Sequence, residues 1–585
     1  MSTQVRSFIR FFFEVGVFFL ATALAFVFFT AVYPLGDGEG LTAIYPYAAA
    51  FFVGGIIYMM AYMIGGGEGK DIERGERLVP TWKVKLLSWW KTLGDPHPFF
   101  WAGLWYPFVS GVMSLAAVGA PGSGKTVIIR LFLQSILPKI GIVPDHRALL
   151  YDAKGDYLPI LAGMGIDVSE ERGLVKTLHP FDLRAWSWEL WLDLKDFRSI
   201  DEIVVIFIPV QGGNDDHGFW SSSARSLLKG VFKALIESGK PWTLYDVCTY
   251  MRSFDRMRQL IEDTPETRHL IEKILEKGKT SDGIDVTLYS YMERYEVIAA
   301  IWNKIPKERR ISLTEWLNDP DGSILLLGRG ARGTAHDAIN QLIIDRLGQL
   351  ITIYQEDSST RRTWVVFDEI RQSGRLNLDP IATMGRSKGA VLAIGYQDQS
   401  GLQDAYNKEI ADELLGMCQH KTFFYLGTAQ TAHYAAEQIG KQEYKDESGA
   451  IKERYVVLPS QFTSRAYIPE TNRRNGCTFY AKSATFGAYK MRLRGRRLFV
   501  KLLRPLDKSV KGFEARPASD QRFTETIALP ENETLELEQQ KRLEIEYVPQ
   551  EVQNVKDEAR ETAEAIKELR KRRSAAKERS DGRER

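Results

Sequence analysis

Cysteine and net charge are both scarce in this sequence. Its three cysteines, Cys248, Cys418 and Cys477, lie far apart in a chain of 585 residues. An odd number of isolated cysteines argues against a disulfide framework and a cysteine-based metal cluster, and it is typical of buried thiols in a reducing compartment. The formal net charge is only +2, so any surface that binds nucleic acid must be local.

Charged residues are missing from two apolar runs near the amino terminus. Val15 to Tyr33 and Ala43 to Ile64 contain no Asp, Glu, Lys or Arg. Each run is long enough to cross ~30 Å of hydrocarbon as a helix. A signal peptide is the alternative for the first run, but no cleavage pattern of small residues precedes the second. We therefore predict a two-helix transmembrane hairpin in residues 1–66.

The basic residues around these runs predict their orientation. Arg6 and Arg10 precede the first run, whereas the linker 34–42 carries Asp37 and Glu39 and no Lys or Arg. The basic residues that follow the second run are Lys70, Arg74, Arg77, Lys83, Lys85 and Lys91. By the positive-inside rule, both ends of the chain lie in the cytoplasm.

Residues 112–130 read VMSLAAVGAPGSGKTVIIR, a glycine-rich loop between two apolar segments. The loop has the Walker A pattern G-x-x-x-x-G-K-T, made of Gly119, Ala120, Pro121, Gly122, Ser123, Gly124, Lys125 and Thr126. Such a loop turns backbone N–H groups and a helix amino terminus toward phosphates. Lys125 would reach the β- and γ-phosphates of ATP, and the Thr126 hydroxyl would bind Mg²⁺. A plain glycine-rich turn is the alternative, but the predicted strand and helix on either side favour a nucleotide site.

An acidic pair ends a second apolar segment, WVVFDE, at residues 364–369. Asp368 would hold Mg²⁺ through water, and Glu369 would orient or deprotonate the attacking water. Alone, this stretch fits an exposed acidic turn equally well. In the same chain as a Walker A loop, it favours the second half of an ATPase site.

Further strand patterns alternate with helical ones, which predicts an α/β fold with a parallel, doubly wound sheet. The predicted strands cover residues 147–151, 174–178, 323–327, 390–396 and 421–426. Gln397 follows one of them and would sense the γ-phosphate, unless it is an ordinary turn residue. Residues 199–313 lack strand patterns and predict an all-helical insertion, either a cap facing DNA or another substrate or a structural lid.

Three other features leave alternatives open. Five tryptophans suit either a lipid headgroup layer or packing against the core: Trp82, Trp89, Trp90, Trp101 and Trp105. The acid-free stretch 482–504 predicts a hairpin turning near Gly495, whose basic face contacts phosphate or protects a sheet edge. Residues 531–585 predict a charged tail, disordered or helical, that docks cytosolic partners.

The ordered motifs GAPGSGKT, YDAKGDY, HPFDLRAW, FWSSSARSLLKG, WVVFDE and GRSKGAVLAIGYQDQSGLQDAY, behind the apolar runs, resemble the type IV coupling proteins. These are membrane-anchored ATPases of bacterial conjugation and type IV secretion. The resemblance covers roughly residues 1–460. It implies an inner-membrane protein with a RecA-like motor, assembled as a hexamer. Hydrolysis of ATP with Mg²⁺ would drive a relaxase-bound DNA strand, or effector proteins, into the secretion channel.

The resemblance also assigns roles to single residues. Arg386 would be an arginine finger that reaches the nucleotide of a neighbouring subunit, although a solvated loop arginine fits the spacing equally well. Gln397 matches the sensor glutamine. No arginine occurs in residues 92–129, so a second finger would need a substitute such as Arg329 or Arg332. Asn407 stands where the family has glycine, and Asn also tolerates left-handed backbone geometry.

Together these patterns predict five regions along the chain. They are an anchor (1–66), the first part of the nucleotide-binding domain (67–198), an all-helical domain (199–313), the second part with a basic β extension (314–530), and the tail (531–585). Two other functions remain open: a substrate-docking receptor whose ATPase serves assembly only, and an FtsK-like DNA pump.

Overall fold

The computed structural model describes residues 72–169, 173–194, 197–209, 216–270, 280–329, 333–446 and 448–521. The chain separates into two units, 1–523 and 524–585, and all described residues belong to the first. Both apolar runs and the predicted tail lie outside the described residues. Within them, no helix has the combined length and hydrophobicity needed to cross a membrane. The transmembrane hairpin therefore stays a prediction.

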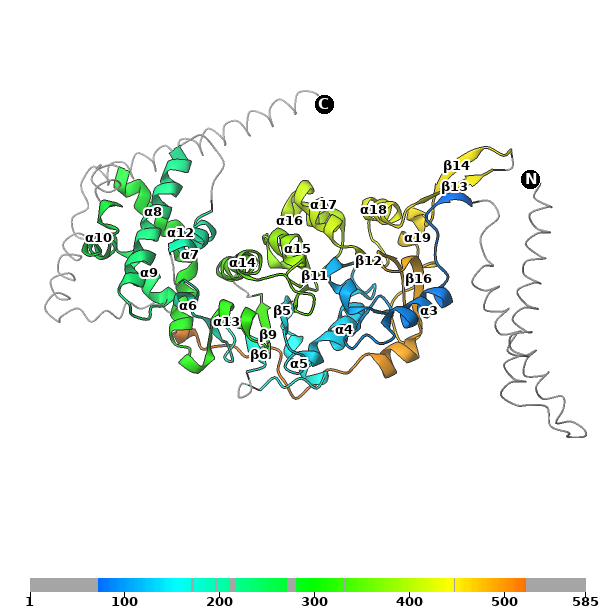
Figure 1. The fold of residues 1–585 in the computed structure, drawn as a ribbon, viewed down its shortest axis with the longest axis horizontal. Helices are drawn as coiled ribbons and strands as arrows, with labels where there is room; N and C mark the ends of the chain where they lie inside the picture. The colour runs from blue at the N-terminus through cyan, green and yellow to red at the C-terminus, as the bar shows by residue number, and fades with distance from the viewer. Residues whose placement is uncertain are drawn as a thin grey trace, which may run out of the picture. The chain divides into compact units, whose positions relative to one another are not determined.

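A nine-stranded sheet forms the centre of this unit (Figure 1). Across the sheet the strands are β16 (Gly487–Leu493), β15 (Cys477–Ser483), β12 (His420–Phe423), β4 (Leu115–Val118), β11 (Ala390–Tyr396), β10 (Arg362–Phe367), β5 (His146–Asp152), β9 (Ile324–Gly328) and β6 (Val175–Thr177). All pairs from β12 to β6 are parallel. The predicted parallel α/β core is thus present, and the antiparallel strands β15 and β16 extend one edge of it.

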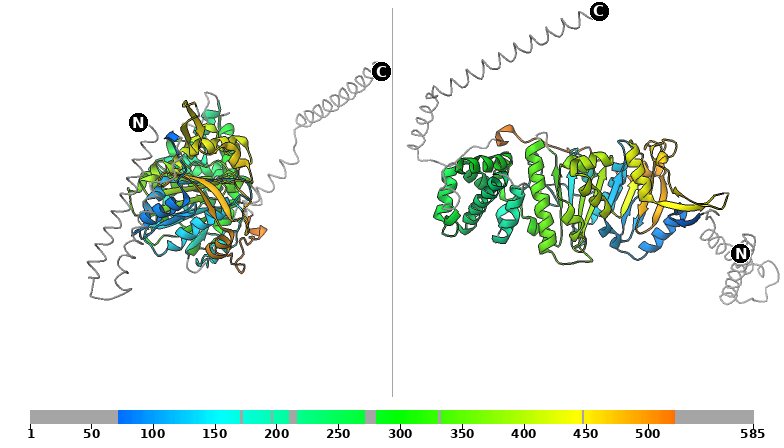
Figure 2. Two further views of the ribbon diagram at one scale, coloured as in Figure 1. Left: turned by 90° about the vertical axis from the view of Figure 1, so that its right-hand side faces the viewer. Right: turned by 90° about the horizontal axis from the view of Figure 1, so that it is seen from above.

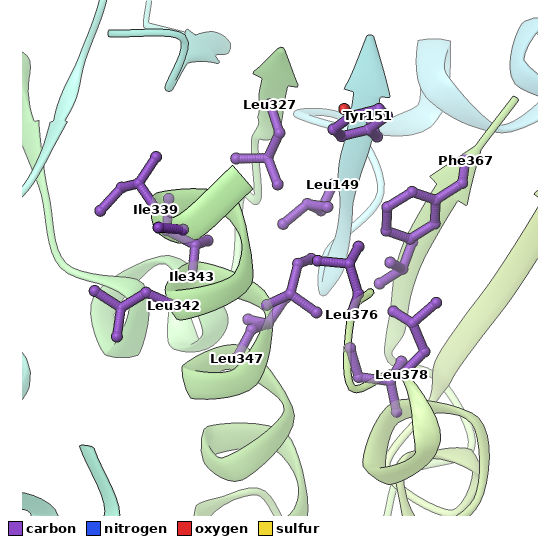
Figure 3. Packing of buried hydrophobic residues seen from close by; sticks show 14 of the residues in the cluster. Leu149, Tyr151, Leu327, Ile339, Leu342, Ile343, Leu347, Phe367, Leu376 and Leu378 are labelled. Atoms are coloured by element: carbon purple, nitrogen blue, oxygen red, sulfur yellow. The ribbon is translucent and has the colours of Figure 1, made fainter. Parts of the chain in front are cut away.

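Alternate residues of the central strands feed two separate hydrophobic clusters, one on each face of the sheet. In β10, Val365 and Phe367 join one cluster, whereas Trp364 and Val366 join the other. A strand buried on both faces must be apolar throughout, which explains the continuous run in WVVF. Figure 3 shows α14 (Gly333–Gln349) packing its leucines and isoleucines against β5, β9 and β10 on the first face.

The remaining helices cover the two faces of the sheet. Beside α14, the first face carries α15 (Asp379–Ala382), α16 (Gln399–Tyr406), α17 (Lys408–Met417), α18 (Ala429–Ile439) and α19 (Pro459–Thr463). The second face carries α3 (Thr81–Thr92), α4 (Lys125–Ile136), α5 (Tyr157–Gly163) and the hairpin of β2 (Phe99–Trp101) and β3 (Leu104–Tyr106). A small separate sheet joins β1 (Ile72–Gly75), β13 (Lys441–Lys445) and β14 (Ile451–Tyr455).

Between β6 and β9 the chain forms mainly helices, gathered beyond the β6 edge of the sheet (Figure 2). They are α6 (Leu190–Asp193), α7 (Phe197–Phe207), α8 (Asp216–Glu237), α9 (Leu244–Arg252), α10 (Phe254–Asp263), α12 (Thr280–Asn303) and α13 (Leu313–Asn318). The apolar face of α8 is buried at Ala224, Leu227, Leu228 and Val231.

One end of the predicted all-helical region is wrong. β8 (Arg310–Ile311) pairs in parallel with β7 (Ser187–Trp188), so a short strand lies inside residues 199–313. Pro306 precedes a single 3₁₀ turn there, and Ile311 is buried. Packing of this one side chain holds the chain extended, a tertiary effect that local patterns do not reveal. The predicted domain boundaries themselves stay predictions.

The predicted hairpin around Gly495 is also wrong. The hairpin turns between Ser483 and Gly487, and β16 pairs with β15 rather than with the residues after Gly495. Residues Arg497–Leu502 form a helical turn, η8, anchored by the buried Leu498. β16 ends at Leu493, and a Cβ atom at Gly495 would lie 1.9 Å from the Arg473 carbonyl oxygen. The close approach of these two backbones therefore requires glycine at this position.

The five tryptophans near the amino terminus differ in their exposure to solvent. Trp101 is 1% exposed and meets Phe132 of α4 edge to face, with ring centroids 5.6 Å apart. Trp82, Trp89 and Trp90 on α3 are exposed, as is Trp105 on β3. Only Trp101 therefore packs into the core.

The motif HPFDLRAW has a structural role in this fold. Asp182 accepts two side-chain hydrogen bonds from Arg184 and one from the Glu514 amide. The amide of Leu183 donates to the Glu514 carbonyl, and the Arg516 amide donates to the Phe181 carbonyl. These bonds fasten the last described segment of the chain to the edge of the sheet at β6 and β9.

Candidate nucleotide-binding site

The Walker A loop connects β4 to α4, as predicted from the sequence. α4 begins at Lys125, and Gly124 before it has a left-handed φ of 109°. A Cβ atom at Gly124 would lie 2.6 Å from both Thr471 Oγ1 and Cys477 Sγ. Glycine is thus required here for its conformation and for the space behind the loop.

The acidic pair ends β10, and β11 lies between β10 and β4 in the sheet. Lys125 Nζ donates a hydrogen bond of 2.6 Å to Glu369 Oε2. Thr126 Oγ1 lies 3.0 Å from Asp368 Oδ2 and donates to it. Lys125, Asp368 and Glu369 are all buried. The fold therefore brings together two motifs that lie more than 200 residues apart, at the carboxyl edge of the parallel strands, where ligands bind in such sheets.

Gln397 lies at the same edge, directly after β11. It lines a cavity of about 160 Å³ together with Glu369 and Tyr396. This space is large enough for water molecules beside the Glu369 carboxylate. Gln397 and Glu369 therefore line the same cavity.

The residues present fit a phosphate group and a magnesium ion. Ser123 Oγ in the loop is buried and has no hydrogen-bond partner among the described residues, which leaves it available to a phosphate oxygen. Thr126 and Asp368 offer the oxygen ligands that Mg²⁺ prefers. Nearby, burial and then the Asp152 carboxylate raise the pKa of Asp156 above its ordinary value. This negative region would be relieved by a cation.

Comparison with known proteins identifies the family. Residues 99–462, more than half of the chain, match the family described as the type IV secretion-system coupling protein DNA-binding domain. The chain belongs to this family.

The chain is similar in sequence to the coupling protein TraD of Escherichia coli strain K12. It is 22% identical over 344 residues, which are 57% of this chain and 45% of TraD. The chain thus matches less than half of the length of this coupling protein.

Solved structures of a bacterial conjugative coupling protein, TrwB, share the fold. The unbound monoclinic form of TrwBdeltaN70 is 22% identical, with a TM-score of 0.59, over 77% of this chain and 98% of that one. Its trigonal form with sulphate is 20% identical, with a TM-score of 0.61, over 77% and 99%. The TrwB complex with ADP and Mg²⁺ is 20% identical, with a TM-score of 0.59, over the same shares. These likenesses show that this member of the coupling-protein family shares the α/β fold of TrwB.

Arg386, the predicted arginine finger of this coupling-protein family member, lies away from the other site residues. It is exposed in the turn η7 (Met384–Arg386), before the first residue of β11, whereas Gln397 follows the last. Because a strand rises ~3.3 Å per residue, β11 separates Arg386 from its own nucleotide edge by about 20 Å. Its neighbours fix the turn, since Ser387 Oγ and Lys388 Nζ both bind Asp357.

The two substitutes considered for a second finger are placed differently. Arg329 is exposed directly after β9, at the same edge as the Walker A loop. Arg332 lies outside the described residues. Asn407, where this coupling protein departs from the family's glycine, has a φ of 63° and caps α17 by accepting from the Ile410 amide. That position therefore has a positive φ, but its ψ of 166° lies outside the left-handed helical region that asparagine tolerates.

Three residues at the site were given no specific role from the sequence. Asp152 accepts hydrogen bonds from the amides of Lys154, Gly155, Asp156 and Tyr157, which shapes the loop after β5. That loop holds Lys154 Nζ 3.8 Å from Asp368 Oδ2. The motif YDAKGDY at a strand end was the signal for both residues.

Thr471 is the third of these residues, and it had no such signal. Its Oγ1 donates a 2.6 Å hydrogen bond to the Ser123 carbonyl from a segment 348 residues along the chain. Only the tertiary fold brings it to the Walker A loop.

Proposed function

We propose that this chain is an ATP-driven coupling protein, which hydrolyses ATP to deliver DNA into a type IV secretion channel during conjugation. The observation that carries the proposal is the pair of contacts from Lys125 to Glu369 and from Thr126 to Asp368. Membership of the coupling-protein family and the likeness to TrwB, whose complexes include ADP with Mg²⁺, support the same function.

In the proposed hydrolysis of ATP, a few residues would bind the phosphates, hold Mg²⁺ and activate water. The loop amides and Lys125 would bind the phosphates of ATP, while Thr126 and Asp368 would hold Mg²⁺. Mg²⁺, when bound, would neutralise negative charge on the phosphates. A phosphate that takes the Lys125 ammonium group frees the Glu369 carboxylate to accept a proton from water. Gln397 would orient that water from the other side of the cavity.

We propose that the chain forms a homo-oligomer, a hexameric ring, and the position of Arg386 supports this. At about 20 Å from the nucleotide edge of its own subunit, Arg386 does not reach its own nucleotide. On a subunit surface it can enter the site of a neighbour. There a guanidinium group would stabilise charge that develops on the transferred phosphate, as an arginine finger does.

We further propose that the chain is anchored in the bacterial inner membrane by two helices in residues 1–66, with both termini in the cytoplasm. The distribution of basic residues supports this orientation. The partners of the protein would then be the secretion channel proteins and a relaxase-bound DNA strand or effector proteins.

The full chain, reconstituted into vesicles at low salt, tests the proposal by phosphate release with and without single-stranded DNA. DNA should stimulate hydrolysis, and Lys125→Ala should lower it at least ~10²-fold because a phosphate-binding charge is lost. Lys508→Ala, which removes an exposed lysine elsewhere, is the matched control and should behave as wild type.

The alternative function as a docking receptor gives a different result. If DNA does not stimulate hydrolysis and the Lys125→Ala variant still supports conjugative transfer in cells, ATP hydrolysis does not drive delivery. The proposed motor function would then be rejected.

A further inference from the structure

Helix α3 carries apolar side chains on the side that faces solvent. Trp82, Trp89 and Leu93 recur at i, i+7 and i+11, and Trp90 lies beside them. Trp89, Trp90 and Leu93 are 57%, 62% and 61% exposed. Trp82 and Trp105 are also exposed, at 38% and 46%. We call Trp82, Trp89, Trp90, Leu93 and Trp105 the indole face.

The indole face is exposed because the opposite side of α3 is firmly attached to the core. Val84 is fully buried, and the buried Ser88 Oγ donates to the Trp105 carbonyl at 2.7 Å and accepts from the Trp105 amide at 3.0 Å. Thr81 Oγ1 donates to the Lys490 carbonyl of β16. A rotation of α3 that would bury its indoles would break these hydrogen bonds.

A groove of about 1160 Å³ adjoins the indole face at the β16 edge of the sheet. Its floor is apolar, formed by Phe100, Leu131, Leu493, Leu498 and Leu502. Its rim is basic, formed by Lys85, Arg492, Arg494, Arg496, Arg497 and Lys501. Trp105 of the indole face also lines the groove, so the two features form one continuous surface.

The basic rim has no acidic counterpart in the described part of the chain. None of the groove's lining residues is acidic, and none of the six basic side chains forms an ion pair with a described residue. Unpaired cations around an apolar floor suit a ligand with an anionic head and an apolar body. A phospholipid has that composition, and its phosphate would meet the rim while its glycerol and upper acyl carbons would meet the floor.

The position of this surface favours a bilayer over a nucleotide or DNA. The groove is lined by Leu131 and Gln134 in the second half of α4, at the end of that helix away from the Walker A loop. Only seven residues, 65–71, separate the second apolar run from Ile72, so the chain between Ile64 and Ile72 spans at most ~28 Å. From there the chain contacts β16 through the bridge between Leu78 and Ala488 and then enters α3.

We propose that the indole face and the adjoining basic groove bind the surface of the membrane, with anionic phospholipid headgroups held by Arg494, Arg497 and their neighbours. This inference rests on the proposed membrane anchor. Exposed indoles beside lysines are typical of the interfacial layer, and basic pockets next to membrane spans bind anionic lipid headgroups. The site would hold the ATPase core at a fixed orientation to the bilayer.

The test uses the full chain in vesicles of phosphatidylcholine with phosphatidylglycerol, where one lipid at a time carries a photoactivatable headgroup. Peptides labelled on illumination are identified by mass spectrometry. We expect phosphatidylglycerol to label residues 81–106 and 487–502 in preference to phosphatidylcholine. Arg494→Gln with Arg497→Gln should lower the phosphatidylglycerol labelling of residues 487–502 at least about tenfold, because two charges near the surface are lost.

Two further variants separate the groove from general effects. Trp89→Ser with Trp90→Ser should lower the labelling of α3 by both lipids, since apolar contact is lost. Lys240→Gln with Lys307→Gln removes two exposed charges from the helical region and should leave every label unchanged. Unchanged labelling in the arginine variant would reject the proposal. So would single-stranded DNA that displaces the phosphatidylglycerol label, because the groove would then be a nucleic-acid site.

Alkaline carbonate extraction of the same vesicles tests the anchor independently. Protein that stays in the membrane but acquires no label in the groove contradicts the groove alone. Protein that is extracted, yet was labelled in the groove, contradicts the anchor and supports the groove.

Discussion

The Walker A loop and the basic groove are both suited to anionic phosphate, but they are built in opposite ways. In the loop, the binding cation Lys125 is 8% exposed and already paired with Glu369. In the groove, exposed arginines such as Arg494 and Arg497 have no acidic partner in the described chain. The first site is closed and its charge is compensated, whereas the second is open and its charge is not.

This difference shows how ion pairing of the cation determines which ligands a phosphate site accepts. A ligand of the loop must replace the Glu369 carboxylate on Lys125, so only a group that also satisfies the loop amides gains by binding. A ligand of the groove would replace only water, so anionic headgroups of varied structure would be accepted. Buried pairs favour selectivity, and unpaired surface charge favours attraction that salt weakens.

The largest expected effect comes from Arg386, the proposed arginine finger, which lies too far from the nucleotide edge of its own subunit to act there. Arg386→Ala should lower hydrolysis ~10³- to 10⁵-fold in the assembled protein and leave nucleotide affinity unchanged, because the guanidinium acts on charge formed during reaction. Phosphate release and nucleotide titration measure the two quantities.

Mixing two inactive variants tests whether Arg386 acts on the nucleotide of a neighbouring subunit. Arg386→Ala subunits retain Glu369, and Glu369→Gln subunits retain Arg386, so mixed assemblies contain some complete sites. Activity that returns on mixing supports a finger from the neighbour. Mixtures as inactive as their components would contradict it.

A smaller effect is expected from breaking the ion pair of the loop. Glu369→Gln should lower turnover ~10²- to 10⁴-fold because the proton acceptor is lost. The same change should tighten nucleotide binding, since Lys125 loses its competing carboxylate. Fluorescent nucleotide titration checks this, with Glu409→Gln on the exposed start of α17 as the control. Weaker binding would show that the carboxylate does not compete.

A smaller loss is expected when support behind the loop is removed. Thr471→Val deletes the hydrogen bond to the Ser123 carbonyl, which is worth ~1 kcal/mol. Nucleotide affinity should therefore fall about fivefold. Thr463→Val, which removes an exposed hydrogen bond to Ser460 on α19, is the matched control. Equal affinities in both variants would exclude a role for Thr471 in shaping the loop.

The smallest expected effect is a difference in salt sensitivity between the basic groove and the Walker A loop. Raising salt to physiological strength should reduce phosphatidylglycerol labelling of the groove several-fold, because exposed charges are screened. Nucleotide affinity should change less, since Lys125 and its pair are buried. Measurement of both in one vesicle preparation tests the comparison directly, and equal sensitivity would remove the distinction.

Local spacing predicted the loop and the acidic pair because each motif lies at the end of a strand that is recognisable by itself. The register of β15 and β16 was not predictable in this way. The alternation in residues 487–493 gives no indication of which neighbour pairs with it, and the close approach of Gly495 to Arg473 depends on the folded chain. Pairing partners, unlike periods, are a tertiary property.

The burial of aromatic side chains was also not predictable from local sequence patterns. Trp89, Trp90 and Trp101 lie close together in the sequence, yet only Trp101 is buried, in a hairpin that packs on α4. Thr471 reaches Ser123 from a distant segment, so no local pattern reports it. For Arg386, the resemblance gave a role, and the structure added the separation from its own nucleotide edge.

A single strand, β11, carries Gln397 directly after its last residue and Arg386 shortly before its first. In the proposed ring, each copy of this strand would therefore link the catalytic centre of one subunit to that of the next. A short strand of this kind would pass a displacement at one nucleotide site to the next site. The order in which the subunits hydrolyse ATP would then follow the order of the strands around the ring.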